Sequence, residues 1–155
     1  MYRRSVCTVC EIIENFRDQG RYYRLVPHYD SSLVIHAPVD SPKRFFRPLL
    51  TKTEIDSLIE SIPSIKCLDV NDRILENAYK DLFNSEKHED LICIIKTAYL
   101  HNEQRIQGGQ RRSEKDRMYF QKAEQALYGE LAVALEKTIE ETRDYIVERV
   151  GALTA

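Results

Sequence analysis

The sequence lacks the features that mark several large classes of protein. No stretch approaches the ~18 consecutive apolar residues that a helix needs to cross a membrane. The glycine-rich phosphate-binding motifs of nucleotide-binding enzymes and the serine-centred motif of hydrolases are also missing. Arg3 and Arg4 are not followed by an apolar block, so we expect no signal peptide and a cytoplasmic location. These absences favour a soluble protein that is not an enzyme and uses no cofactor.

The sequence has four cysteines, and we expect reduced thiols because no signal peptide is predicted. Cys7 and Cys10 have the C-x-x-C spacing of zinc sites and thiol redox enzymes. They lie, however, in a segment rich in Val, Ile and Thr that predicts a strand, where residues three apart point to opposite faces. Cys67 and Cys93 form no second C-x-x-C. We therefore expect small packing residues and no metal site.

The distribution of charge, of proline and of strand signals divides the chain near residue 50. Residues 1–51 carry 8 Lys and Arg against 5 Asp and Glu, whereas residues 52–155 carry 15 against 20. Four of the five prolines and all clear strand signals fall in the first part. We predict an α+β protein, with a small antiparallel β module over residues 1–50, curled into a partial barrel. A compact helical domain of five helices is expected over residues 51–155.

Alternating apolar residues and turn signals predict the strands of the first part. They are expected at residues 6–16, 21–26 and 33–39, with a short fourth strand at residues 44–46. Gly20 marks the turn after the first strand, because glycine tolerates a positive φ. Pro38 limits the third strand to the edge of a sheet, since proline has no N–H to donate to a ladder.

Apolar stripes at helical spacing predict the helices of the second part. They are expected at residues 51–62, 71–83, 87–107, 113–135 and 138–150. Two capping boxes, TKTE at residues 51–54 and TIEE at residues 138–141, mark the starts of the first and last helices. The inner faces are expected to include Ile74 on the second helix, Tyr99 on the third and Phe120 on the fourth.

Short strings in a consistent order resemble the CarD/CdnL family of bacterial transcription regulators. After Tyr2, the strings are SVCTV (5–9), YYRL (22–25), PHYD (27–30), APVD (37–40), RPLL (47–50), IKTAYL (95–100) and YFQKAEQALYGELA (119–132). The resemblance covers nearly the whole chain, and the order of the strings is more specific than any one of them. It implies a Tudor-like β module that binds the β subunit of RNA polymerase, followed by a helical domain that contacts promoter DNA. The β module resembles one also found in transcription-repair coupling factors.

The sequence departs from the family pattern in two places. Family members usually begin with a further strand, whereas this sequence begins at or after the tyrosine of that strand, so the first strand is clipped or missing. A missing strand would expose a sheet edge, which invites self-association. Members that melt promoters use a tryptophan wedge, but this sequence has no tryptophan and places Asp72 near that position. Phosphates would repel a carboxylate there, so we do not expect wedge action.

The resemblance and the distribution of charge predict two binding surfaces. The resemblance places the polymerase-pairing strand at residues 33–39, where a partner strand would extend the sheet by β-augmentation. The candidate polymerase-binding residues are Leu33, Val34, Ile35 and His36, with Arg17, Arg21 and Arg24 as a charged rim. The candidate DNA-binding residues are Arg105, Arg111, Arg112, Lys115 and Arg117. These side chains, or the amides of the following helix start, would meet phosphates without reading base sequence.

Three functions remain open from the sequence. The first is a regulator that binds RNA polymerase and stabilises promoter complexes through weak DNA contact. The second is a protein-only adaptor of the same fold, favoured by the acidic helical part and the absence of tryptophan. The third, and least favoured, is a thiol redox enzyme, which needs a cysteine of lowered pKa.

Overall fold

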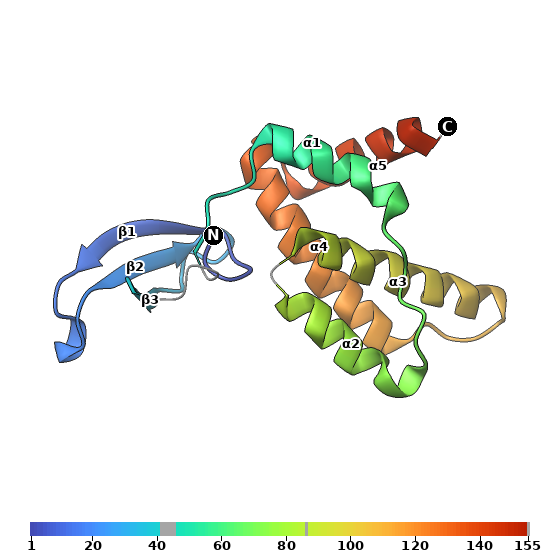
Figure 1. Ribbon diagram of the computed structural model, residues 1–155, viewed down its shortest axis with the longest axis horizontal. Helices are drawn as coiled ribbons and strands as arrows, with labels where there is room; N and C mark the ends of the chain where they lie inside the picture. Colours follow the sequence, from blue (N-terminus) through green and yellow to red (C-terminus); the bar gives the residue numbers. More distant parts are fainter. Residues whose placement is uncertain (41–45, 86, 155) are drawn as a thin grey trace. The chain divides into compact units, whose positions relative to one another are not determined.

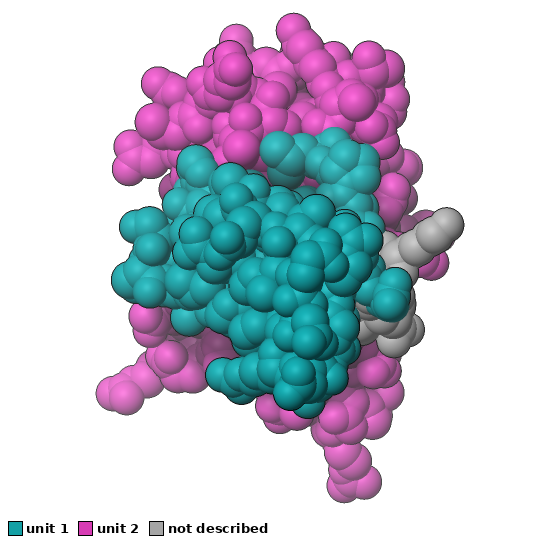
Figure 2. Space-filling model, turned by 90° about the vertical axis from the view of Figure 1, so that its left-hand side faces the viewer, with its two compact units in different colours: residues 1–49 teal, residues 50–155 magenta. Residues whose placement is uncertain are grey.

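The computed structural model describes residues 1–40, 46–85 and 87–154, and these residues form an α+β protein. A three-stranded antiparallel sheet occupies the first part of the chain, and five α-helices occupy the second (Figure 1). The chain divides into two compact units, residues 1–49 and residues 50–155, which Figure 2 distinguishes by colour. The division between the two units falls one residue before the boundary predicted from the sequence.

The sheet has the order β1-β2-β3, with β2 in the middle. Strands β1 (Cys7–Ile13), β2 (Tyr22–Pro27) and β3 (Ile35–Pro38) pair antiparallel, so β2 uses both of its edges. A β-bulge between Val9 and Glu11 interrupts the register of β1 against β2. Each outer strand has one edge that no other strand of the described residues pairs.

A short helical turn ends β1 earlier than the sequence predicted. Asn15 takes a left-handed conformation, with φ 51°, and begins the 3-10 helix η1 (Phe16–Asp18). The prediction of a strand continuing to residue 16 is therefore wrong. Gly20 leads into β2 with φ 102°, a conformation that side chains with a Cβ rarely adopt, as expected for a turn glycine.

A turn at Asp30 shortens β3 relative to the prediction. The Asp30 side chain accepts a hydrogen bond from the backbone N–H of Ser32, and its carbonyl accepts one from the N–H of Leu33. The turn holds Leu33 outside the ladder, so the strand begins only at Ile35. The prediction that Leu33 and Val34 belong to the strand is therefore wrong, although both directly precede it.

One face of the sheet carries the core of the first unit. Leu25 and Ala37 are fully buried there. Tyr23, opposite Ala37 in the ladder, contacts Phe46 with ring centroids 5.5 Å apart, and Phe46 contacts Tyr2 at 4.9 Å. Phe46 also forms an isolated β-bridge with Tyr2, whereas the rest of the expected fourth strand lies outside the described residues.

Each helix of the second unit begins one residue after its predicted start. They are α1 (Lys52–Ser61), α2 (Asp72–Asn84), α3 (His88–Gln107), α4 (Glu114–Leu135) and α5 (Ile139–Thr154). Thr51 and Glu54 form the expected capping box, and Thr138 and Glu141 exchange the same pair of hydrogen bonds. A 3-10 turn, η3 (Ile62–Ser64), follows α1 directly. None of the described helices is both long and apolar enough to span a membrane.

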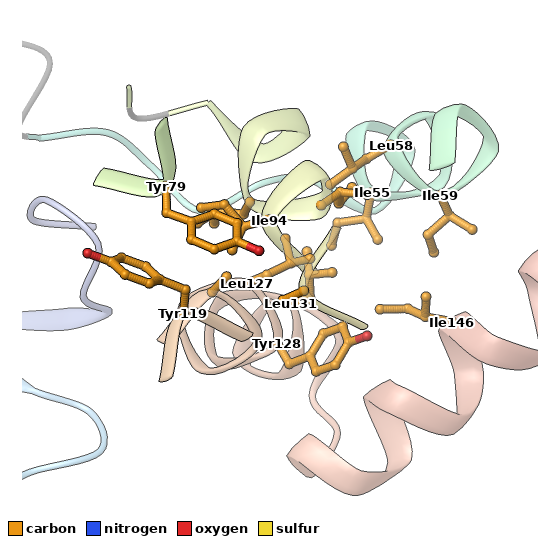
Figure 3. Packing of buried hydrophobic residues seen from close by; sticks show 14 of the residues in the cluster. Ile55, Leu58, Ile59, Tyr79, Ile94, Tyr119, Leu127, Tyr128, Leu131 and Ile146 are labelled. Carbon is orange, nitrogen blue, oxygen red and sulfur yellow. The ribbon is translucent and has the colours of Figure 1, made fainter. Parts of the chain in front are cut away.

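Helix α4 is central to the second unit, packing along α3 and contacting α1, α2 and α5 (Figure 1). The apolar stripes of these helices meet in one core, and Figure 3 shows the side chains converging. Its largest fully buried members are Ile55, Ile59, Leu75, Tyr79, Leu91, Ile94 and Leu131. Burial of a side chain of this size contributes about 1.5–3 kcal/mol, so this core holds the helices together.

Two residues expected on inner helix faces lie at the surface instead. Ile74 is 48% exposed, because Leu75 and Tyr79, four residues apart, define the buried face of α2. Tyr99 is 60% exposed, because Ala98 takes the inward position on α3. Where two neighbouring apolar residues lie at the border of an apolar stripe, periodicity alone does not predict which of them is buried.

A buried carboxylate ties α2 and α3 to the start of α4. Asp116 is 2% exposed, and its Oδ1 accepts a hydrogen bond from the Tyr79 hydroxyl at 2.6 Å. The same oxygen lies 3.4 Å from His101 Nδ1. The Tyr79 ring also stacks on Tyr119, with ring centroids 5.0 Å apart. Since an unsatisfied buried carboxylate is costly, these partners favour one arrangement of the three helices.

A second buried carboxylate lies further along α4. Glu130 is 1% exposed, and its Oε2 accepts a hydrogen bond from the backbone N–H of Leu50 at 3.1 Å. Its Oε1 lies 2.8 Å from His88 Nε2 at the start of α3. Glu130 therefore fixes the entry to α1 and the beginning of α3 against α4.

The Tyr79–Asp116 hydrogen bond makes stability depend on alkaline pH. Burial, with the bond to Asp116, raises the pKa of Tyr79 above its ordinary value of 10.0. The unfolded chain then releases this proton first, so the free energy of unfolding falls as the pH rises above 10.0. We expect Tyr79→Phe to be less stable than the wild type by about 1–3 kcal/mol at neutral pH. The difference should shrink at alkaline pH, because the variant has no such proton to lose.

Denaturant unfolding of both proteins at neutral and at alkaline pH measures this difference. The other tyrosines are common to both proteins, so their titration cancels in the comparison. A stability difference that is the same at both pH values would contradict the expected link to Tyr79.

Candidate functional site

The outer edge of β3 presents backbone groups that β2 does not use. In an antiparallel ladder, successive residues turn their N–H and C=O groups alternately to either side. The N–H of Val39 donates to the Arg21 carbonyl at 3.1 Å, so Ile35 and Ala37 also face β2. The N–H and C=O of His36 consequently face away from the sheet, and no described residue hydrogen-bonds to them.

Apolar and aromatic side chains border this edge. Leu33 and Val34, just before β3, are 48% and 44% exposed. The His36 ring stacks on Phe16, with centroids 4.4 Å apart, and the Arg17 guanidinium lies 5.1 Å from the centroid of the Phe16 ring. Exposed apolar side chains beside an unpaired strand edge suit contact with another protein.

The other arginines of the predicted rim are paired within the sheet. Arg24 forms an ion pair with Glu11 at 2.9 Å across β1 and β2, and Arg21 forms one with Glu14 at 3.2 Å. All four side chains are more than a third exposed, and such pairs contribute little to stability. Both arginines can therefore exchange these partners for carboxylates on another protein.

The outer edge of β1 is the second unpaired edge among the described strands. Val9 and Ile12 on this strand are 54% and 48% exposed. The self-association expected from the sequence would use this edge.

Cys7 and Cys10 are both free thiols. The ladder pairs Val9 and Glu11 with consecutive residues of β2, so Cys10 is the extra residue of the bulge. The Cys10 thiol donates to the Thr8 carbonyl at 3.8 Å. Burial raises the pKa of the Cys7 thiol, which opposes a nucleophilic thiolate. Within the described ranges, no group of three or more His, Cys, Asp or Glu is placed to hold a metal ion.

The basic residues predicted for DNA contact fall into two groups, and Asp72 faces the first. Arg105, at the end of α3, lies 3.9 Å from the Asp72 carboxylate at the start of α2. Lys115 donates a hydrogen bond to the Asp72 backbone carbonyl at 3.4 Å. The negative charge at the expected wedge position therefore offsets the attraction of Arg105 and Lys115 for phosphate.

The second group belongs to a groove between α3, α4 and α5. The groove has a volume of about 800 Å³, and Arg112 and Arg117 line it together with the rings of Tyr99 and Phe120. Arg111 is exposed in the preceding loop and does not line the groove. The aromatic rings were missed as site residues, because their spacing predicts core positions. The signal on α3 was the polar pair Asn102 and Glu103, one turn after Tyr99, which marks an exposed face.

One backbone N–H at the N-terminus of α4 is already capped by a side chain of the protein. The Ser113 side chain caps it by accepting a hydrogen bond from the Asp116 N–H at 3.3 Å. Glu114 and Asp116 lie in its first turn, and Glu114 pairs with Arg117 at 3.3 Å. A phosphate at this helix start would be repelled by the exposed Glu114 carboxylate and by the negative charge of the buried Asp116, so basic side chains must carry any DNA contact.

Comparison of the chain with protein-family models and with curated proteins gives no match. The candidate site therefore rests on the geometry of the two units and on the resemblance of the sequence strings.

Asp72 provides a test of whether Arg105 can contact DNA. Replacing Asp72 with Ala removes the carboxylate that faces Arg105 and leaves the backbone carbonyl that binds Lys115. We expect Asp72→Ala to bind forked promoter DNA about two- to fivefold more tightly, since an exposed charge pair is worth up to ~1 kcal/mol. The affinity should also fall more steeply with salt.

Fluorescence anisotropy over a series of salt concentrations measures both effects. Glu76→Ala is the matched control, because Glu76 is exposed one turn further along α2 and pairs with Lys80 at 3.7 Å. Equal affinities for the wild type and Asp72→Ala would show that Arg105 takes no part in DNA binding.

Proposed function

We propose that the protein is a transcription regulator that binds RNA polymerase through the outer edge of β3 and contacts promoter DNA weakly through its helical unit. The carrying observation is the outward-facing backbone of His36, because such an edge can pair with a partner strand. The sequence resemblance to the CarD/CdnL family directs the choice of partner to the polymerase β subunit. It also supports assigning the first unit to the Tudor-like class and the protein to the bacterial cytoplasm.

The polymerase contact would combine main-chain hydrogen bonds with apolar burial. A partner strand lying along β3 would bond to the N–H and C=O of His36 and cover the exposed side chains of Leu33 and Val34. Pro38 limits the length of the shared ladder, since it offers no N–H. Arg17 and Arg24 would then orient the partner and speed its association more than they would raise affinity.

The DNA contact would be weak and independent of sequence. The helical unit carries more acidic than basic residues, so only local clusters can attract phosphates. Arg111 and Arg112 form no ion pair with a described residue and are exposed. A few phosphate contacts of this kind position a protein on DNA without reading bases.

A protein-only adaptor of the same fold is the second candidate, and Asp72 is the observation that favours it. The Asp72 carboxylate and carbonyl engage Arg105 and Lys115, which leaves fewer cations for DNA. Such an adaptor would bind polymerase through β3 and show no salt-dependent affinity for forked promoter DNA.

A proline at position 36 tests the proposed polymerase contact. In His36→Pro the outward N–H is lost, while the ladder with β2 keeps its hydrogen bonds because residue 36 faces away from it. We expect this variant to lose capture of the polymerase β subunit by about tenfold or more, which corresponds to ~1.4 kcal/mol. A pull-down with purified β subunit measures the loss.

His36→Ala is the matched control, because it removes the imidazole and keeps the backbone donor. We expect it to retain most of the binding. Amide chemical shifts of Tyr23 and Ala37, measured by nuclear magnetic resonance in both variants, establish that β3 stays paired with β2. Full binding by a folded His36→Pro would refute pairing through this edge.

A further inference from the structure

The groove between α3, α4 and α5 brings aromatic, cationic and amide side chains together. Its volume of about 800 Å³ lies within the ~300–1,000 Å³ that is typical of small-ligand sites. Tyr99 and Phe120 provide rings on the wall. The amides of the lining are Asn102, Gln121 and Gln125. A site of this composition can meet a planar ring and its polar edge at the same time.

The charges of the groove leave Arg112 and Arg117 available to an anion. Arg143 forms an ion pair with Glu124, so this carboxylate of the lining is already neutralised. Arg117 pairs with Glu114 in an exposed contact, which is too weak to hold the guanidinium away from a ligand. Arg112 has no ion-pair partner within the described part of the chain.

The remaining carboxylate of the lining restricts where an anion can lie. Glu103, on α3, forms no ion pair with any residue that the structure describes, so it repels negative charge. An anion should therefore lie beside Arg112 and Arg117, and the uncharged part of the ligand should lie toward Tyr99.

The aromatic rings form a surface on which a base can stack. Tyr99 is 60% exposed, although it belongs to a helix packed along α4, and Phe120 is partly buried. Proteins that bind single strands combine such rings with a basic groove, because every base has a face that can stack. A base within a duplex is already stacked on its neighbours and cannot enter a groove of this kind.

We propose that this groove binds a nucleotide unit of single-stranded nucleic acid. The phosphate lies beside Arg112 and Arg117, and the base lies against Tyr99 and Phe120. The inference deepens the DNA contact of the proposed function and rests on it, because it directs that contact to unpaired strands. A free mononucleotide has the same chemistry, so the two sources are separated in the test.

Fluorescence anisotropy of the full chain, with a labelled oligothymidine and a labelled duplex, tests the proposal. We expect the single strand to bind more tightly than the duplex. Tyr99→Ala should weaken single-strand binding about fivefold or more, given the strength of base stacking on aromatic rings. Arg112→Ala should lower the salt dependence by about 0.7 in the logarithmic slope. Leu100→Ala is the matched control, since Leu100 is 42% exposed on α3 but does not line the groove.

The results of these binding measurements decide the proposal. Unchanged single-strand binding by Tyr99→Ala, or equal affinity for duplex and single strand, overturns it. Competition by thymidine monophosphate as strong as by the oligomer supports the groove and overturns the single-stranded source. A pull-down of polymerase with wild type and Tyr99→Ala separates this inference from the proposed function. Failed capture of polymerase by the wild type overturns the proposed function. Normal capture of polymerase without single-strand binding overturns only the nucleotide site in the groove.

Discussion

Strand β2 uses the backbone groups on both of its edges, and the open edge on which the proposed polymerase contact depends follows from this. Its pairing with β1 and β3 decides which residues of the outer strands face inward. On β3, the residues that face β2 include Ala37, which is fully buried, whereas His36 faces the open edge. Pro38 also occupies an outward position, where its missing N–H costs the ladder nothing. The proposed docking of a partner strand depends on this alternation and not on any single side chain.

In the helical unit, α4 is the element around which the other helices pack. Its apolar stripe forms the middle of the core, and its two buried carboxylates bind the segments around it. Asp116 is held inward by Tyr79, and the next residue, Arg117, lines the groove together with Phe120, whose ring also packs against the core. The same helix thereby supports the core on one side and presents candidate ligand-binding groups on the other.

Much of the fold could be predicted from local signals. Capping boxes and apolar stripes predicted the five helices within a few residues, because these signals act over one or two turns. The predicted end of β1 and the predicted start of β3 were wrong. The left-handed Asn15 and the turn at Asp30 compete locally with strand pairing at these two positions. Apolar periodicity did not predict the exposure of Tyr99, which depends on how α3 is rotated against α4.

The candidate site was predictable in part. The sequence resemblance predicts a binding strand around His36. The direction of the His36 backbone groups, however, depends on the register of the whole sheet. The basic residues were identified as one cluster, whereas the structure places Arg105 and Lys115 beside Asp72, and Arg112 and Arg117 in the groove. Asp72 lies far from both cations in sequence, so local patterns could not predict their contact.

Hydrogen–deuterium exchange at the His36 amide, resolved by nuclear magnetic resonance, tests directly whether the polymerase β subunit pairs with the open edge of β3. The outward N–H has no hydrogen-bond partner among the described residues, so we expect it to exchange fast in the free protein. Addition of the polymerase β subunit should slow this exchange strongly, while the amide of Ala37, directed at β2, should be protected in both states. Slow exchange of His36 in the free protein would show that the edge is already paired, and no change on adding the β subunit would show that the β subunit does not pair with it.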